Sequence, residues 1–486
     1  MGSPLKKISA YLKAIPTQEY AIPAQIAGAI NYFFDSYFQK VEELNSRRPA
    51  DNSPADPKTH VKEVWLGCEI HKAVSLNRSY PMFAKAKNAW AFAKLFESGN
   101  YKIVQFLDEY EWKNAVKGSY EYRIQQESVQ VGPDVAATLP VYGTFFVTDR
   151  VGSKFVVHMD LGYETMSCVV SVMAAPTKKA EAEKFLTDLD MSIEKNDIYY
   201  GQCLSFLRGF LGFTKIRKTG WDEIVLKTDI IQEVRDNSIG VIANMDKLSS
   251  LGMVPSRNMI LISPPGMAKT TIFRAVSDEV ENATRIWCTG KSVQEASDVT
   301  SLFEAARSLA PCIMFIEDMD LFGRSRGMLS GYESHVLNEF LACLDGMHQN
   351  SGIIIMASTN DIQSMDEALV DRPGRFDVKI EIPYPDAVDR SQMMSSFLRR
   401  VNARPDDSVT RETLKVVVEL TDGLTGAYIK ELANATVIRA VAKGNFVAGG
   451  VLFSADDLNS AAEQVVRNYK IGKAARRKLQ AEVVVT

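Results

Sequence analysis

The sequence predicts an α/β fold in which helices flank a parallel sheet, with a helical C-terminal part and an N-terminal α+β domain. Three short apolar runs, residues 259–262, 312–316 and 352–358, have the length and composition of strands that are buried on both faces. A segment patterned as a helix, residues 272–280, follows the first of them. Strands that alternate with helices in this way are typical of parallel sheets.

The loop after the first of these strands has the composition of a phosphate-binding turn. It reads SPPGMAKT and leads into the helix. In such a turn, backbone N–H groups and the helix N-terminus bind phosphate oxygens, a lysine reaches the β- and γ-phosphates, and the next hydroxyl holds Mg²⁺. Because the loop departs twice from the usual GxxxxGK(S/T) pattern, at Ser263 and Ala268, it leaves open a chance strand–turn–helix when taken alone. The predicted nucleotide contacts are Ser263, Pro264, Pro265, Gly266, Met267, Ala268, Lys269, Thr270 and Thr271, and Thr270 is also a predicted ligand of Mg²⁺.

Polar side chains follow the other two strands. Glu317 and Asp318 come at the end of the second run, and Asn360 follows the third. Ligands of open α/β sheets bind at the carboxyl ends of the strands, so we expect these side chains to face the phosphates and Mg²⁺. Arg372 and Arg375 come shortly afterwards in the string VDRPGRFD. The apolar residues of the strands are expected to be sheet core, whereas the polar strand ends indicate a site.

Together, these motifs resemble the AAA ATPases over residues 217–470. The string TNDIQSMDEALVDRPGRFD resembles that family's second region of homology, in which Asn360 takes the position of the γ-phosphate sensor. Arg372 and Arg375 match the arginine fingers that reach into the neighbouring subunit's nucleotide. The resemblance implies an Mg²⁺-dependent ATP hydrolase that works as a homo-oligomeric ring, usually a hexamer.

The same resemblance places the base of the nucleotide. Residues 422–432 (DGLTGAYIKEL) resemble the start of the family's lid helix, which lies beside the adenine. Residues 221–226 (WDEIVL) resemble the strand that opens the ATPase core, and a helix is expected after it at residues 229–248. The residues predicted to lie nearest the adenine are Ile224, Val225, Gly426 and Ala427.

The two carboxylates stand in the reverse of the usual order. Main-line members of the family carry Asp-Glu, with the Asp near Mg²⁺ and the Glu activating water, whereas this chain has Glu317-Asp318. The inversion also occurs in the branch that contains the mitochondrial translocase of the Rieske protein and its soluble bacterial relatives. By position, Glu317 is predicted to bind Mg²⁺ and Asp318 to activate water. A chain that binds ATP without hydrolysing it is the alternative, but the lysine, sensor and arginines favour hydrolysis.

The stretch that carries the pore loop in threading unfoldases lacks the aromatic–aliphatic–glycine triplet. After an expected strand at residues 285–289, the sequence reads GKSVQEASDVTSLFEAARSLAP, in which Phe303 is the only aromatic residue. Alanines follow Phe303 at i+3 and i+7, which predicts a core-facing position on a helix. We therefore expect action on folded or partly folded protein clients rather than threading of an unfolded chain.

The composition gives no reason to expect nucleic acid, a zinc site or a membrane span. The net charge is −4, the six cysteines show no metal-binding spacing, and no segment reaches about 18 uninterrupted apolar residues. The most apolar N-terminal stretch, residues 20–38, contains polar residues and no cleavage site, so we expect a helix rather than a signal peptide. These features favour a cytoplasmic protein and count against the alternative of a DNA-handling AAA protein.

We divide the chain into four parts: a helical segment with a linker (1–60), an α+β domain that meets a client (61–216), a large ATPase subdomain (217–386) and a helical lid with a tail (387–486). The predicted function is a ring-forming ATPase that chaperones or remodels a protein client, and the alternative is an ATP-binding assembly scaffold with negligible hydrolysis. In the α+β domain, helices are expected at residues 80–99 and 178–191, and strands at 121–131, 140–148, 154–161 and 166–173. A further strand, resembling the one before the ATPase core in the soluble bacterial branch, is expected within residues 196–207. Lid helices are expected at residues 388–401, 410–420, 426–443 and 455–469, the last one capped by Ser454.

Overall fold

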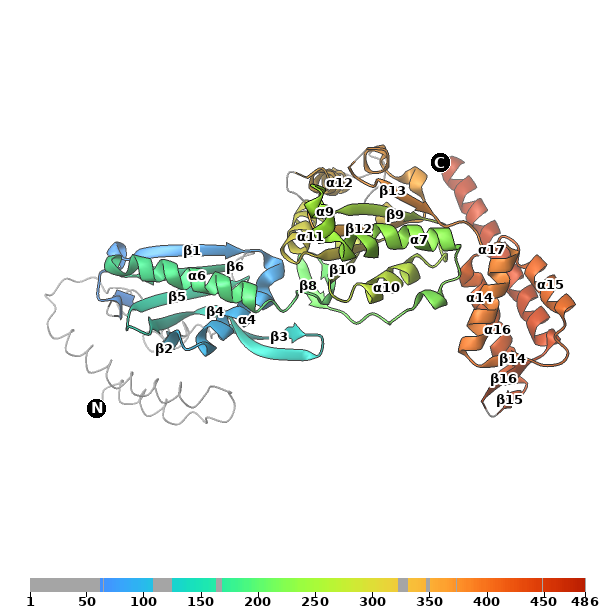
Figure 1. Ribbon diagram of the computed structural model, residues 1–486, viewed down its shortest axis with the longest axis horizontal. Helices are drawn as coiled ribbons and strands as arrows, with labels where there is room; N and C mark the ends of the chain where they lie inside the picture. Colours follow the sequence, from blue (N-terminus) through green and yellow to red (C-terminus); the bar gives the residue numbers. More distant parts are fainter. Residues whose placement is uncertain are drawn as a thin grey trace. The chain divides into compact units, whose positions relative to one another are not determined.

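The computed structural model describes residues 62–63, 65–107, 125–162, 168–321, 331–346, 350–372, 374–447 and 449–485. The expected N-terminal helix, its linker and the first residues of the strand expected at 121–131 lie outside the described residues. The chain divides into two compact units, Met1–Tyr199 with Gly209–Phe213 and Tyr200–Arg208 with Thr214–Thr486 (Figure 1). Within the described part of the chain, no helix is long and apolar enough to cross a membrane.

The first unit contains an antiparallel sheet with the strand order β1-β6-β5-β4-β2, and β3 pairs with β4. This confirms the predicted N-terminal α+β fold, including the strand at residues 154–161. The helix expected at residues 80–99 begins later, because Tyr80 still pairs with Cys168 in the sheet. The elements are β1 (Val74–Tyr80), α4 (Lys85–Glu97), β2 (Tyr101–Leu107), β3 (Gln125–Gly132), β4 (Val135–Asp149), β5 (Lys154–Leu161), β6 (Cys168–Ala174), α6 (Lys179–Lys195) and β8 (Phe210–Phe213).

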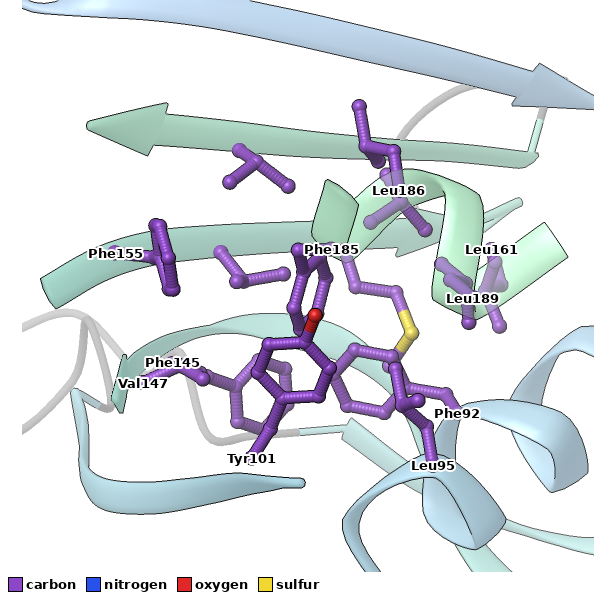
Figure 2. Packing of buried hydrophobic residues seen from close by; sticks show 14 of the residues in the cluster. Phe92, Leu95, Tyr101, Phe145, Val147, Phe155, Leu161, Phe185, Leu186 and Leu189 are labelled. Carbon is purple, nitrogen blue, oxygen red and sulfur yellow. The ribbon is translucent and has the colours of Figure 1, made fainter. Parts of the chain in front are cut away.

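An aromatic core joins α4 and α6 to the sheet. Figure 2 shows Phe92 of α4 and Phe185 of α6 pointing toward the side chains that stand up from the strands. The ring of Phe92 lies 5.2 Å from that of Phe145, and the ring of Phe185 lies 4.8 Å from that of Tyr101. The alternation of buried and half-buried residues along β6 follows from the period-2 geometry of a strand.

The second unit contains the predicted parallel sheet, in the order β13-β9-β12-β11-β10-β7. All seven residues of β12 are buried, which explains its uninterrupted apolar sequence. β7 lies before the boundary predicted at residue 217, yet it pairs with β10 in this sheet. The elements are β7 (Cys203–Leu207), β9 (Arg257–Ile262), α10 (Lys269–Glu279), β10 (Thr284–Thr289), α11 (Ala296–Ser308), β11 (Cys312–Glu317), α12 (Gly331–Leu344), β12 (Ile353–Thr359), α13 (Glu367–Val370) and β13 (Val378–Glu381).

Two predictions for the entry to this unit are wrong. Residues 221–226 form no strand: Trp221–Glu223 is a 3-10 turn and the next residues are extended without a pairing partner. Their apolar side chains pack against two separate cores instead of in a sheet, and only Ile224 is fully buried. The helix expected at 229–248 is broken into α7 (Thr228–Asn237), α8 (Ile239–Ala243) and α9 (Met245–Ser250). Ser238 has non-helical dihedrals, and its hydroxyl donates to the carbonyl of Val234 at 2.6 Å, which competes with helix continuation.

The C-terminal part forms the predicted helical lid, with one feature that the sequence reading missed. A small sheet in the order β14-β16-β15 packs with the helices. The last helix runs well beyond residue 469, and Ser454 caps it as predicted, accepting from the N–H of Asp457 at 3.2 Å. The elements are α14 (Ala387–Arg400), β14 (Ala403–Pro405), α15 (Arg411–Leu420), α16 (Gly426–Ala442), β15 (Phe446–Val447), β16 (Gly450–Phe453) and α17 (Ala455–Val485).

Candidate nucleotide site

The predicted phosphate loop connects β9 to the N-terminus of α10. Gly266 and Ala268 both have positive φ angles, +83° and +64°, which turn the loop back over the first turn of the helix. A left-handed conformation is costly for a residue that carries a Cβ, so Ala268 holds a strained position that glycine occupies in the usual pattern. Strain of this kind persists where the surrounding structure enforces it, and it often marks functional loops.

The Lys269 ammonium is buried within this loop. It donates to the carbonyl oxygen of Ser263 at 2.7 Å and to the Ser263 hydroxyl at 3.0 Å, and it lies 3.3 Å from the carbonyl of Pro264. Burial lowers the pKa of Lys269 from 10.5 to about 8, although the nearby carboxylates oppose the shift. A buried cation without a full countercharge is well suited to bind a polyphosphate.

Asn360 connects Lys269 to the carboxylates. Its Oδ1 accepts a hydrogen bond from Lys269 Nζ at 2.8 Å, and its Nδ2 donates to Asp318 Oδ1 at 3.2 Å. β12 delivers Asn360 to the edge of the sheet where β11 delivers Asp318, because the two strands are parallel neighbours. The structure therefore brings together three of the residues predicted from separate motifs.

Glu317 lies on the other side of the loop and fits the predicted Mg²⁺ site. The Thr270 hydroxyl is within hydrogen-bonding reach of its carboxylate, while Glu317 Oε1 is buried and has no partner among the described residues. Burial raises the pKa of the Glu317 carboxyl above its ordinary value, and the Thr270 contact opposes this. No group of three or more His, Cys, Asp or Glu within the described ranges could hold a metal alone. Mg²⁺ usually needs only one or two carboxylates beside phosphates and water, so the fit is to Mg²⁺ with a nucleotide.

Asp318 is exposed at the end of β11 and stands in a left-handed conformation with φ +52°. Its backbone N–H lies 3.4 Å from the Ser358 hydroxyl of the neighbouring strand. The carboxylate of Asp318 thus faces the open side of the site beside Asn360, whereas that of Glu317 faces Thr270. This is the arrangement that the predicted roles require, and the roles themselves stay predictions.

A third carboxylate at this edge, Asp320, was missed by the sequence reading. Its Oδ1 lies 3.4 Å from both the backbone N–H of Asn360 and the Thr359 hydroxyl. It also contributes to the negative field around Lys269. Asp320 lies in the 3-10 turn Met319–Leu321 that follows β11, so no strand pattern in the sequence marks it.

The start of the lid helix α16 packs directly on the phosphate loop. The N–H of Ala427 donates to the carbonyl of Gly266 at 3.0 Å. A Cβ on Gly266 would come within 2.7 Å of the Ala427 side chain, so this contact admits only glycine at position 266. A Cβ built on Gly426 would lie 3.4 Å from the same carbonyl oxygen. Residues 426 and 427 thus lie against the phosphate loop, and their contact with the adenine stays a prediction.

Ile224 and Val225 were both predicted to lie near the adenine, and of these two only Val225 lines a hollow. The hollow lies between the phosphate loop and the lid, where Met267 and Met393 also line it. Ile224 is 7% exposed and belongs to the core of the ATPase sheet, so its predicted contact with adenine is not supported. The remaining loop residues lie nearby: Pro264 and Thr271 are half-buried, Pro265 is exposed and Met267 is buried.

The two predicted arginine fingers differ sharply. Arg375 is 3% exposed, and it donates to Asp345 through Nε at 2.7 Å and Nη2 at 2.5 Å, and to the Ala368 carbonyl through Nη1. The Arg375 guanidinium could reach another subunit only if its hydrogen bonds to Asp345 and Ala368 broke. Arg372 is exposed, and its side chain makes no hydrogen bond or ion pair within the described residues. Neither arginine pairs with Asp371 or Asp377, the internal partners that the string itself suggests.

A family model for the ATPase family associated with various cellular activities (AAA) matches residues 259–384, which hold this loop, both strand ends and both arginines. The chain carries an AAA ATPase domain. A domain of this family implies ATP hydrolysis. The match also accounts for the parallel sheet, most of whose strands lie within residues 259–384.

Relatives of known function match over the AAA ATPase domain and little else. The chain is 33% identical over 207 residues to the ATP-dependent zinc metalloprotease YME1L of Drosophila melanogaster, covering 41% of this chain and 27% of the relative. It is 33% identical over 249 residues to the ATP-dependent zinc metalloprotease FtsH of Halothermothrix orenii, covering 49% and 39%. The human relative YME1L1 is 32% identical over 222 residues, covering 44% and 27%. The chain therefore spans well under half the length of these relatives.

Proposed function

We propose that the chain hydrolyses ATP with Mg²⁺ and that a ring of identical subunits couples this turnover to the chaperoning or remodelling of a protein client. The observation that carries the proposal is the linked set of Lys269, Asn360 and Asp318 beside the Glu317 and Thr270 pair. These residues can bind the γ-phosphate, hold a water for attack and ligate Mg²⁺, which are the tasks of phosphoryl transfer.

The roles in the reaction follow from the positions. Lys269 would bind the β- and γ-phosphates, releasing its contacts with Asn360 and the Ser263 hydroxyl as the phosphates arrive. Asn360 would then be available to the γ-phosphate, and Asp318 would accept a proton from the attacking water. Mg²⁺, when bound, neutralises charge on the phosphates, and Thr270 and Glu317 are the residues that would hold it.

The ring and the client are inferred from what AAA proteins do and from the relatives. The relatives are ATP-dependent proteases by name, which supports ATP-driven handling of proteins. We do not extend peptidase activity to this chain, because the match covers at most 39% of these relatives. The N-terminal antiparallel unit would meet the client. The buried Phe303, whose ring lies 5.5 Å from that of Phe340, leaves the pore-loop stretch without an exposed aromatic among the described residues, which supports the non-threading, translocase-like branch. A cytoplasmic location is part of the same proposal.

One observation favours a second function, an assembly scaffold that binds ATP with negligible turnover. Arg375 is committed to Asp345 in its own chain, so only Arg372 remains to complete a neighbouring site. If Arg372 does not reach that site, ATP could stabilise the ring without rapid hydrolysis.

Steady-state phosphate release separates the two functions. We expect turnover that requires Mg²⁺ and is lost in Lys269→Ala, because the loop then has no side-chain cation at the β- and γ-phosphates. Lys415→Ala, which removes an exposed lysine of α15, is the matched control and should retain the wild-type rate. Tight ATP binding with no phosphate release above the Lys269→Ala background would instead support the scaffold.

A further inference from the structure

The segment that enters the ATPase unit is held by ion pairs rather than by strand pairing. We call residues 217–227 the strap. On one side it is tied to the C-terminal end of α10, where the N–H of Thr219 donates to Asp278, and to the turn that follows, where Lys218 pairs with Glu281 at 3.0 Å. Ile224 anchors the same side in the core of the parallel sheet. The strap is thus attached to the large subdomain that carries the phosphate loop.

The strap is also tied to the lid, through two separate ion-pair sites. The guanidinium of Arg400 in α14 makes two contacts with Glu223: Nη1 pairs with the carboxylate at 3.1 Å, and Nη2 donates to the backbone carbonyl at 2.8 Å. Lys227 pairs with Asp386 at 2.5 Å and Asp389 at 3.2 Å, the two residues of the capping box that opens α14. The Glu223 and Asp389 side chains are only 18% and 14% exposed, so these charges are partly shielded from water. Both sites therefore join the strap to one lid helix.

The hollow beside the phosphate loop lies between these two attachments. Val225, Leu226 and Lys227 of the strap form one wall, and Met267 of the loop and Met393 of α14 contribute others. Val225 also packs against the lid core, while its neighbour Ile224 packs in the core of the large subdomain. The strap, the phosphate loop and the lid therefore meet at this hollow.

We propose that Glu223 and Lys227 are positioning residues, which clasp the strap to α14 so that binding of the nucleotide base and docking of the strap stabilise each other. This inference rests on the proposed function, because it takes the base of ATP or ADP as the occupant of the hollow. The coupling is reciprocal by thermodynamic necessity: whatever the clasp adds to base affinity, the base adds to strap docking. The proposed coupling is confined to the strap, the phosphate loop and α14, which all belong to the second unit.

The magnitude follows from the exposure of the ion pairs. Each pair of this kind contributes little by itself, because water screens its charges. Loss of both sites should therefore weaken ADP binding by about three- to tenfold. The loss should shrink at high salt, because screening weakens the wild-type clasp and leaves the neutral variant unchanged.

The test compares hydrogen exchange of strap amides in the full chain with and without bound ligand. The variant is Glu223→Gln with Lys227→Gln, which removes the charges and keeps the side-chain length. The matched control is Lys218→Gln, which removes the exposed strap ion pair to Glu281, in the turn after α10, and leaves the lid contacts in place. The probes are ADP, which carries a base, and inorganic tripolyphosphate, which carries phosphates alone. Calorimetry on the same samples measures binding.

We expect ADP to slow exchange across the strap in the wild type and in Lys218→Gln, and tripolyphosphate to leave it unchanged. In the double variant, ADP should bind about three- to tenfold more weakly at low salt and protect the strap less. Bound ADP without strap protection in the wild type would overturn the clasp while leaving the proposed function intact. Equal protection by tripolyphosphate would overturn the role of the base, and failure of ADP to bind at all would overturn both.

Discussion

The two arginines give the sharpest prediction, because the structure assigns them different jobs. Removing Arg375 breaks an ion pair whose guanidinium is 3% exposed, but whose carboxylate partner Asp345 is 45% exposed. A fully buried pair costs about 3–5 kcal/mol when one partner is removed, and hydration of Asp345 reduces this to about 2–3 kcal/mol for Arg375→Ala. Arg372→Ala removes an exposed side chain and should change stability by less than about 0.5 kcal/mol.

Catalysis should show the opposite ranking in stable protein. An arginine finger supplied by a neighbour is worth about 10³–10⁵ in rate, so we expect Arg372→Ala to lower ATP turnover by about 10³-fold without a change in melting temperature. Arg375→Ala should melt about 4–12 °C lower, given about 2–4 °C per kcal/mol for a unit of this size. Asp345→Asn should reproduce much of that shift, which makes it the control for loss of the pair alone.

The assay is thermal unfolding together with phosphate release well below the melting temperature, followed by mixing. Inactive Arg372→Ala chains mixed with inactive Lys269→Ala chains should recover part of the activity, because some interfaces then join an intact loop to an intact finger. If Arg375→Ala melted at the wild-type temperature but lost all turnover, the assignment of Arg375 to stability would be wrong. If the two variants formed mixed rings that stayed inactive, the assignment of Arg372 as a finger for the neighbouring subunit would be wrong.

Burial lowers the pKa of Lys269 to about 8, so at pH 8 we expect ATP binding to be accompanied by uptake of about half a proton, because the phosphates favour the charged ammonium. Calorimetry in buffers of different ionisation enthalpy measures this proton uptake. Uptake that persists in Lys269→Met would show that another group takes up the proton. Asp318→Asn should retain ATP and slow turnover by about 10²-fold or more, whereas Glu317→Gln should weaken the Mg²⁺ dependence of binding, and the reverse pattern would exchange their roles. Ala268→Gly should raise the melting temperature slightly, because glycine removes about 1 kcal/mol of left-handed strain. Arg375 holds the pKa of Asp345 below its ordinary 3.8, so the stability gap between Arg375→Ala and wild type should be full above that pH and narrow below it.

Much of the site could be predicted because it is built from local patterns. The strand, loop and helix that hold Lys269 are contiguous, and their dihedral and burial requirements select residue types that can be recognised in one stretch of sequence. The polar ends of β11 and β12 meet because parallel strands place their carboxyl ends at one edge. Asp320 escaped notice because its role depends on a turn after β11 rather than on a strand pattern.

The wrong predictions concern segments whose burial comes from distant parts of the chain. Residues 221–226 have the composition of a strand, but Ile224 is buried in one core and the half-buried Val225 packs against another, so no sheet edge is needed to cover them. The string around Arg375 suggested nearby aspartates as partners, yet the guanidinium pairs with Asp345, 30 positions earlier. Spacing in the sequence carries no signal for such a contact.

Short-range periodicity and turn chemistry encode the parallel sheet, the phosphate loop and the family of the ATPase domain, so these could be inferred from local sequence patterns. Long-range packing sets which of the two arginines is exposed, that Val225 and not Ile224 lines the hollow, and how Glu223 and Lys227 join the strap to α14. Those decisions rest on pairs of charges and apolar contacts that form only when segments far apart in the chain have packed together, and the stability of each pair depends on how much water that packing leaves around it.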